Sequence, residues 1–264
     1  MRPMICAAII STLAAGAASA QQPAESANDR PDLSGIWSTF PGVNPVSGLK
    51  REVAGVQETR IVDRTAIRGV VSKGSGVLPW TDAPSYKPEF QAKVKELDSL
   101  QSKTDPVFYC AKPGLPRVGP PRRILQFPNE MIFLYEDMSG DPYRVIPTDG
   151  RQHRANANPS YYGDSVGRWE GHTLVIDARN FVEDTWFGEK GYFHTDAMRV
   201  TERLWRDGEN LVWQVTVDDP KVLTTPWTMA PRMVKRSTQP LEESPACREQ
   251  DGALLQNNDH HDQR

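Results

Sequence analysis

The sequence lacks an apolar run long enough to cross a membrane. Its longest apolar stretch, residues 5–18, is shorter than the about 20 residues that a spanning helix needs. Arg2 precedes this stretch, and Ala18-Ser19-Ala20 ends it as a small-residue cleavage site. This order is typical of a secretory signal peptide. We expect residues 1–20 to be removed after Ala20, which leaves a periplasmic or secreted protein with no integral membrane segment.

Cysteine is also scarce, with 3 residues in the whole chain. Cys6 lies in the predicted signal peptide, so Cys110 and Cys247 remain. Neither has a cysteine or histidine at the spacing of a zinc site, and we predict no metal. Oxidising compartments preserve disulfides in exported proteins. We therefore predict a disulfide between Cys110 and Cys247; the alternative is two separate buried thiols.

Several signatures of nucleic-acid binding and catalysis are missing. The formal net charge of −3 provides no basic excess to attract nucleic acid, and we predict no such partner. The chain has no Gly-x-Ser-x-Gly elbow, no His-Glu-x-x-His pair, no dinucleotide fingerprint and no phosphate-binding loop. We therefore predict no cofactor, so that any catalysis would be cofactor-independent.

Short segments of alternating polarity dominate the middle of the chain. Tight-turn sequences separate four of them, for which we predict strands at residues 165–169, 173–177, 197–206 and 211–217. Each strand has one apolar face that must be buried, which favours a sandwich or a barrel. Gly35-Ile36-Trp37 is similar to the first strand of lipocalin-like barrels, where the tryptophan closes the floor. We predict a mainly β fold, a lipocalin-like antiparallel barrel.

One helix is expected to pack against this barrel. Residues 88–100 place Phe90, Val94, Leu97 and Leu100 on one side of a helix and charged residues on the other. The domain organisation that we predict is a signal peptide at 1–20, a mobile lead-in at 21–31, a single barrel domain at 32–250 and a disordered polar tail at 251–264.

Longer motifs resemble those of a largely uncharacterised family of exported bacterial proteins. The matching segments are Asp32-Leu33-Ser34-Gly35-x-Trp37, Cys110-x-x-Pro113-Gly114-x-Pro116-Arg117, Thr148-Asp149-Gly150-Arg151-x-His153, Ser165-Val166-Gly167-x-Trp169-Glu170-Gly171-x-Thr173-Leu174-Val175, His194-x-Asp196-Ala197-x-Arg199-Val200-Thr201-Glu202-Arg203 and Asp218-Asp219-Pro220-Lys221 with Pro226-Trp227. The resemblance implies a lipocalin-like fold and an exported protein, but no particular reaction. His172 stands where the family pattern has an acidic residue.

Glu202 is the first candidate for proton transfer. In the strand at 197–206, Met198, Val200, Glu202 and Leu204 share the more apolar face, which should point inward. Burial without a nearby cation would raise the pKa of this carboxyl group into the range of a general acid or base. The alternative is a structural ion pair with Arg168 or Arg199.

Further candidates for catalysis lie in loops and at strand ends. His153, His194 and Tyr162 could converge at the mouth of the barrel, with Asp184 orienting His194. Each is also compatible with a purely structural role. The basic residues of 110–123 suit an anion pocket or, alternatively, a solvated loop.

An aromatic loop suggests the ligand. Trp186, Phe187 and Tyr192 lie close together in the sequence, and we predict that they contact a ligand together with Tyr161 and Arg168. Aromatic rings with a few polar groups suit a small, flat apolar or aromatic molecule. The sequence therefore predicts a carrier of such a molecule; the alternatives are a cofactor-independent lyase, isomerase or hydrolase acting on it, and a structural envelope protein.

Overall fold

The computed structural model describes a chain with several gaps. The described residues are 30–38, 48–53, 56–61, 77–137 and 139–248. The predicted signal peptide, nearly all of the predicted lead-in and the predicted polar tail fall outside these residues.

The described residues form 14 strands and a few short helical segments. The strands are β1 Gly35–Ser38, β2 Gly48–Val53, β3 Val56–Ile61, β4 Arg123–Gln126, β5 Glu130–Leu134, β6 Tyr143–Pro147, β7 Asp164–Glu170, β8 Thr173–Arg179, β9 Trp186–Gly188, β10 Tyr192–Phe193, β11 Arg199–Asp207, β12 Asn210–Asp218, β13 Trp227–Thr228 and β14 Arg232–Ser237. The helices are the 3-10 segments η2 Pro88–Phe90 and η3 Pro106–Tyr109 and the α-helices α2 Gln91–Ser99 and α3 Gln101–Thr104.

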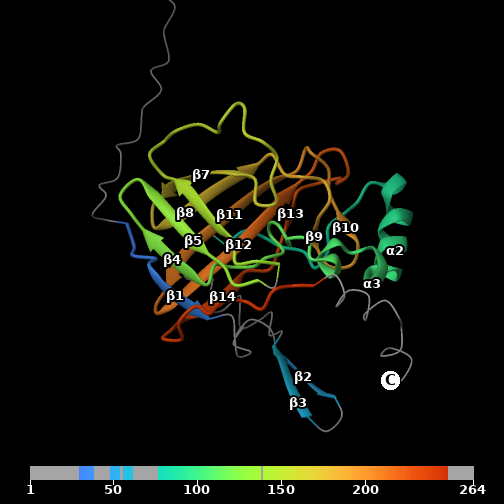
Figure 1. The fold of residues 1–264 in the computed structure, drawn as a ribbon, viewed down its shortest axis with the longest axis horizontal. Helices are drawn as coiled ribbons and strands as arrows, with labels where there is room; N and C mark the ends of the chain where they lie inside the picture. The colour runs from blue at the N-terminus through green and yellow to red at the C-terminus, as the bar shows by residue number, and fades with distance from the viewer. Residues whose placement is uncertain (1–29, 39–47, 54–55, 62–76, 138, 249–264) are drawn as a thin grey trace, which may run out of the picture.

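One antiparallel sheet carries the fold (Figure 1). Its strands follow the order β6-β5-β4-β1-β14-β12-β11-β8-β7, with β13 paired to β12. The four predicted strands in the middle of the chain are β7, β8, β11 and β12, and they lie side by side in this sheet. The prediction of a mainly β fold is confirmed. Two small sheets, β9–β10 and β2–β3, are separate from the large one.

The two ends of the large sheet meet without pairing. Every pair of neighbouring strands is antiparallel, so the first and last of the nine strands in this order, β6 and β7, run in the same direction. Side-chain contacts join Arg144 to Ser165 and bring Gly167 against Ile146. No backbone ladder connects β6 and β7 in the described part of the chain. The sheet is therefore strongly curled but open along this seam.

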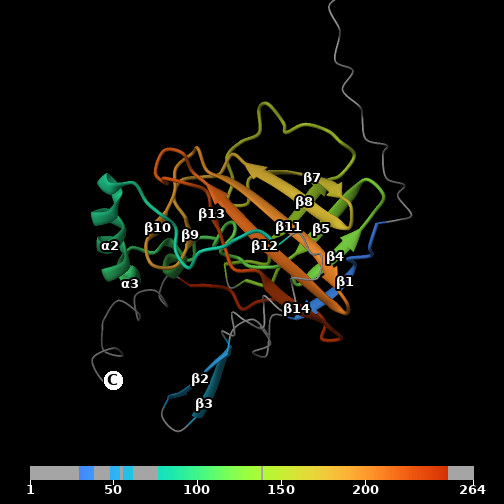
Figure 2. The ribbon, with the colours of Figure 1, turned by 180° about the vertical axis from the view of Figure 1, so that it is seen from behind.

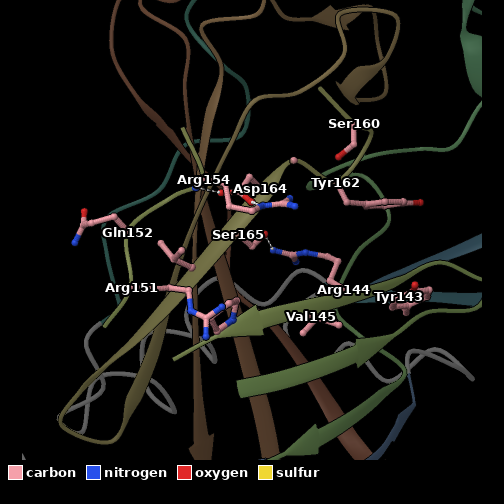
Figure 3. A pocket seen from close by; sticks show the side chains of 13 residues that line it. Tyr143, Arg144, Val145, Arg151, Gln152, Arg154, Ser160, Tyr162, Asp164 and Ser165 are labelled. Carbon is pink, nitrogen blue, oxygen red and sulfur yellow. Dashed lines mark hydrogen bonds and ion pairs between the residues drawn. The ribbon is translucent and has the colours of Figure 1, made fainter. Parts of the chain in front are cut away.

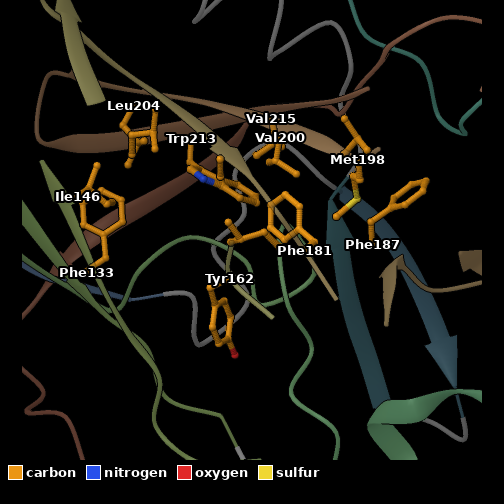
Figure 4. Packing of buried hydrophobic residues seen from close by; sticks show 14 of the residues in the cluster. Phe133, Ile146, Tyr162, Phe181, Phe187, Met198, Val200, Leu204, Trp213 and Val215 are labelled. Carbon is orange, nitrogen blue, oxygen red and sulfur yellow. The ribbon is translucent and has the colours of Figure 1, made fainter. Parts of the chain in front are cut away.

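Side chains fill the concave side of the sheet (Figure 4). Val200 and Leu204 on β11, together with Met198 just before this strand, are fully buried, as the alternation predicted. They meet Trp213 on β12 and Phe133 on β5 in one continuous apolar cluster. Close packing of this kind leaves the interior occupied by protein atoms.

The predicted helix is present and lies at one end of the molecule, beyond β9 and β10 (Figures 1 and 2). Phe90, Val94 and Leu97 are half-buried and pack against the core, whereas Leu100 is exposed. Gly191, in the turn between β9 and β10, lies directly beneath the helix. A side chain at this position would overlap the helix, so the sequence needs glycine here.

The predicted disulfide is confirmed. Cys110 follows η3, and Cys247 lies in the C-terminal segment after β14, with 5.6 Å between their Cα atoms. The bond joins positions 137 residues apart in the sequence. It fixes a segment without regular secondary structure to the middle of the chain.

Candidate functional site

A buried ion pair links strands that are distant in the sequence. Glu202 points inward from β11, and its Oε2 lies 2.6 Å from Nη1 of Arg144 on β6, with side-chain exposures of 0% and 3%. The Trp213 indole N–H donates to the other carboxylate oxygen at 3.0 Å. Arg144 also donates to the hydroxyl groups of Ser165 and Tyr135, at 2.9 and 3.1 Å. The pair therefore ties β6, β7, β11 and β12 together from inside.

The surroundings of this pair favour its charged form. Burial opposes the charge of Arg144, but the Glu202 carboxylate and the Tyr135 hydroxyl together outweigh that effect and raise the pKa of the guanidinium group. Burial raises the pKa of the Tyr135 hydroxyl, which keeps its proton. The partner of Glu202 is Arg144, whereas the sequence suggested Arg168 or Arg199, both exposed. The geometry matches the structural ion pair; a catalytic role for Glu202 stays a prediction.

A cavity of about 500 Å³ lies along the seam between β6 and β7 (Figure 3). We call it the seam cavity. Its walls combine strand residues with the loop between the two strands. They are Tyr143, Arg144, Val145, Pro147, Arg151, Gln152, Arg154, Ser160, Tyr162, Gly163, Asp164, Ser165 and Val166. Because Arg144 lines the cavity, the interior ion pair is one side chain away from it.

His153 bridges two carboxylates beside the seam cavity. Its Nδ1 lies 3.0 Å from Asp164, and its Nε2 lies 2.7 Å from Asp177. Arg154 and Arg179 bind the same carboxylates, each at 2.6 Å. Burial alone would raise the pKa of Asp164, but hydrogen bonds from Arg154 and His153 lower it below its usual range. The cluster fixes the loop after β6 to β7 and β8.

Tyr162 contributes an unpaired hydroxyl group near the same cavity. Its ring stacks on Tyr135 with 6.2 Å between the centroids. The hydroxyl oxygen is buried and has no hydrogen-bond partner among the described residues. Burial, reinforced by Asp137, raises its pKa, so the group stays protonated. Such a hydroxyl can donate a hydrogen bond, and among the described residues no base accepts one from it.

His194 lies in a different environment from the one predicted. Its Nδ1 donates to the Thr195 carbonyl at 3.1 Å, which leaves Nε2 to accept from the Thr185 hydroxyl at 2.8 Å. Burial lowers the pKa of His194 and favours this neutral form. Asp184 is exposed and lies beside Tyr161, whose pKa is raised by burial and by this carboxylate. Within the described residues, no hydrogen bond joins Glu202 to either predicted histidine.

A second cavity, of about 330 Å³, has an aromatic wall. We call it the aromatic cavity. Phe187 of β9, Tyr192 of β10 and Trp227 of β13 contact one another there, with ring centroids 5.7 to 5.9 Å apart. The Trp227 indole N–H donates to the Thr81 carbonyl at 3.1 Å, which fixes the plane of the ring. The wall is therefore rigid and presents ring faces and edges to the cavity.

Two arginines line the aromatic cavity, and they differ in whether a carboxylate pairs with them. Arg117 is held by two hydrogen bonds, of 2.7 and 2.6 Å, to the fully buried Asp105. Arg232 lies over the Trp213 ring at 5.6 Å. In the described part of the chain Arg232 has neither a hydrogen bond nor an ion pair, and burial lowers its pKa. Of these two arginines, Arg117 is compensated by a buried carboxylate, whereas Arg232 has no ion pair in the described part of the chain; the exposed Lys190 is a third cation in the lining.

The structure brings together some of the predicted ligand residues. Phe187 and Tyr192 line the aromatic cavity, whereas Trp186 is buried in the core. Tyr161 lies beside Asp184, and Arg168 is exposed. Trp227 and Arg232 are among the residues of the aromatic cavity that the sequence did not predict as ligand residues. Both residues follow the four predicted strands in the sequence. Trp227 is part of a motif that matches the family, whereas no motif contains Arg232. Arg117 belongs to the basic segment 110–123, for which the sequence suggested either an anion pocket or a solvated loop.

Fold and site together define a mainly antiparallel β protein whose described residues form the seam cavity and the aromatic cavity, among others. The described residues contain no cluster of histidine, cysteine, aspartate and glutamate that could hold a metal ion. Among the same residues, no helix is long and apolar enough to cross a membrane. Comparisons with family models, with curated proteins and with solved structures gave no match.

Proposed function

We propose that this protein binds a small aromatic molecule and carries or sequesters it outside the cytoplasm. The observation that supports this is the aromatic cavity, where three rings from β9, β10 and β13 surround a space of about 330 Å³. Ligand sites are typically concave, mostly apolar and provided with a few polar groups. The rings offer stacking surface, and the two arginines offer the polar groups.

The proposed binding site lies beside the sheet and not inside it. A lipocalin-like barrel remains our proposal for the overall architecture, supported by the curled sheet and by Trp37 of the first strand. Trp37 is fully buried, with the guanidinium groups of Arg206 and Arg236 5.1 and 4.8 Å from its ring. Because side chains fill the concave face, the ligand would occupy the aromatic cavity.

Export is part of the same proposal. The disulfide between Cys110 and Cys247 supports it, because such bonds persist in oxidising compartments. Mass spectrometry of the protein recovered from the periplasm or medium tests it. The expected N-terminus is Gln21; a retained Met1 would contradict the predicted cleavage.

Calorimetric titration with two probes, 2-naphthoate and the neutral 2-naphthamide, tests the aromatic site. We expect saturable binding of at least one probe. Tyr192→Leu should weaken it by roughly three- to tenfold, since an aromatic contact is worth about 0.5–1.5 kcal/mol beyond area burial. The matched control is Tyr143→Leu, which removes an exposed ring from the seam cavity and should leave binding unchanged. Failure of both probes to bind would contradict the proposal.

One observation favours a second function, a cofactor-independent acid–base enzyme acting at the seam cavity. That cavity places the protonated Tyr162 hydroxyl and the Arg144–Glu202 pair within one region. Native mass spectrometry after incubation with a metabolite extract separates the two functions. A bound but unchanged ligand indicates carriage. Altered masses that disappear in Tyr162→Phe indicate catalysis, with a rate loss of about two to four powers of ten.

A further inference from the structure

Among the described residues, no carboxylate forms an ion pair with Arg232, although Asp82 and Glu189 line the same cavity. Arg232 begins β14 and extends over the Trp213 ring into the aromatic cavity, where most of its surface is removed from water. The acidic group that acts on it most is Glu189, which is exposed and forms no ion pair with it. Burial dominates, and it lowers the pKa of the guanidinium group.

Two other arginines whose side chains are largely removed from water have a carboxylate as an ion-pair partner. Arg117 has a bidentate partner in Asp105, and Arg144 has Glu202. Both of those carboxylates are completely shielded from water. Burying a charge is costly unless it is paired, so a ligand anion that contacted Arg232 would offset part of this cost.

The anion must also suit the wall that faces Arg232. Phe187, Tyr192 and Trp227 line the same cavity and exclude water from one side of it. A single planar guanidinium matches a planar carboxylate through two parallel hydrogen bonds. Lys190 also lines the cavity but is exposed, so Arg232 is the cation there that combines a largely buried side chain with the lack of an ion pair among the described residues. The volume of about 330 Å³ is near the lower limit for ligand sites and fits one or two fused rings.

We propose that the ligand is an aromatic carboxylate whose ring packs on the three-ring wall and whose carboxylate binds Arg232. This inference rests on the proposed function, because it specifies the ligand of the same site. The ring supplies apolar contact, and the carboxylate neutralises the buried cation. Neutral aromatic molecules of the same shape would enter the cavity but leave Arg232 unpaired.

The test compares 2-naphthoate with 2-naphthamide in calorimetric titrations of the wild type and Arg232→Met. We expect the wild type to bind 2-naphthoate about tenfold or more tightly than 2-naphthamide, which is the usual advantage of a charge-assisted pair. Arg232→Met should abolish this preference and leave the affinity for 2-naphthamide unchanged. Its melting temperature should equal or exceed that of the wild type, because the change removes an unpaired buried charge.

Lys190→Met is the matched control. Lys190 lines the same cavity with the same charge but is exposed, so solvent screens it. The preference for the carboxylate should survive this change. Equal affinities for the two probes in the wild type, or a preference that persists in Arg232→Met, would overturn the assignment of a carboxylate while leaving an aromatic site intact. If neither probe binds, or Tyr192→Leu has no effect, the aromatic site itself fails and this inference fails with it.

Discussion

At the residue scale, the Glu202 carboxylate has a cation within 2.6 Å and no exposure to water. Glu202→Gln preserves an oxygen that accepts the Trp213 hydrogen bond but leaves Arg144 without its counter-charge. We expect the free energy of unfolding to fall by about 3–5 kcal/mol, because removing one partner strands a buried charge. Urea denaturation measures this loss as a lower midpoint, and the slope of the free energy of unfolding against urea concentration should stay unchanged.

Two further variants make this prediction specific. In Arg144→Met combined with Glu202→Leu both charges are gone, and most of the stability should return. Glu170→Gln removes a half-exposed carboxylate that pairs with Arg168 and Arg203, and it should cost no more than about 1 kcal/mol. A Glu202→Gln protein as stable as the wild type would refute the structural role and favour the catalytic one.

His194 gives the stability a pH dependence of known sign. Burial lowers the pKa of His194 below its ordinary value of 6.5, so the unfolded chain binds a proton more readily than the folded protein does. This contribution to stability is complete above pH 6.5 and declines as the pH falls below it. In His194→Gln we expect a flatter stability profile between pH 6.5 and about 5.

Denaturation midpoints measured across that range check the prediction. His194→Gln leaves every other side chain unchanged, so the comparison isolates the contribution of His194. Identical slopes for the wild type and His194→Gln would show that the proton of His194 does not affect folding in this range.

At the element scale, α2 approaches the turn between β9 and β10 so closely that Gly191 is required. A Cβ there would lie 2.7 Å from the Leu97 Cβ and 2.7 Å from the Val94 carbonyl oxygen, and the backbone has φ +71°. We expect Gly191→Ala to cost about 1–2 kcal/mol for the left-handed conformation and about 1–3 kcal/mol more for overpacking. Denaturation measures the total.

Gly171 supplies the control for the backbone contribution alone. It has φ +58°, and no atom lies within 4 Å of a Cβ built on it. Gly171→Ala should therefore cost only the about 1–2 kcal/mol of the left-handed conformation. If Gly191→Ala and Gly171→Ala lose the same stability, α2 moves away from the added methyl group without a free-energy cost. The close contact between α2 and this turn would then not contribute to stability. Hydrogen exchange in residues 91–99 would then show the helix detaching locally.

At the scale of the whole molecule, the disulfide spans 137 residues and includes most strands of the large sheet. Replacing both Cys110 and Cys247 by serine should lower the free energy of unfolding by about 2–5 kcal/mol. The segment 238–248 has no regular secondary structure and is held otherwise by exposed contacts at Glu242 and Ser244. Its amides should exchange faster in the variant.

Reduced wild-type protein should be as stable as this double variant. The comparison separates the effect of the lost disulfide from the effect of the two serine side chains. Unchanged stability, together with unchanged exchange in the C-terminal segment, would show that the contacts of Glu136 and Asp141 suffice to hold it.

The sequence by itself determined the elements whose periodicity is local. Alternation in residues 197–217 predicted β11 and β12 and the inward orientation of Glu202, because successive side chains of a strand point to opposite faces. The apolar stripe around Val94 predicted α2 for the same kind of reason. The pair of cysteines left in an exported chain predicted the disulfide.

The tertiary structure alone decided which distant residues meet. Arg144 lies on the first strand of the sheet order and Glu202 near its other end, so only the curling of the sheet pairs them. Nine antiparallel strands leave β6 and β7 parallel, which places the open seam and its cavity there. Arg232 likewise reaches the aromatic wall from another part of the chain. No local pattern encodes such meetings, because they depend on strand order and on the path of the loops.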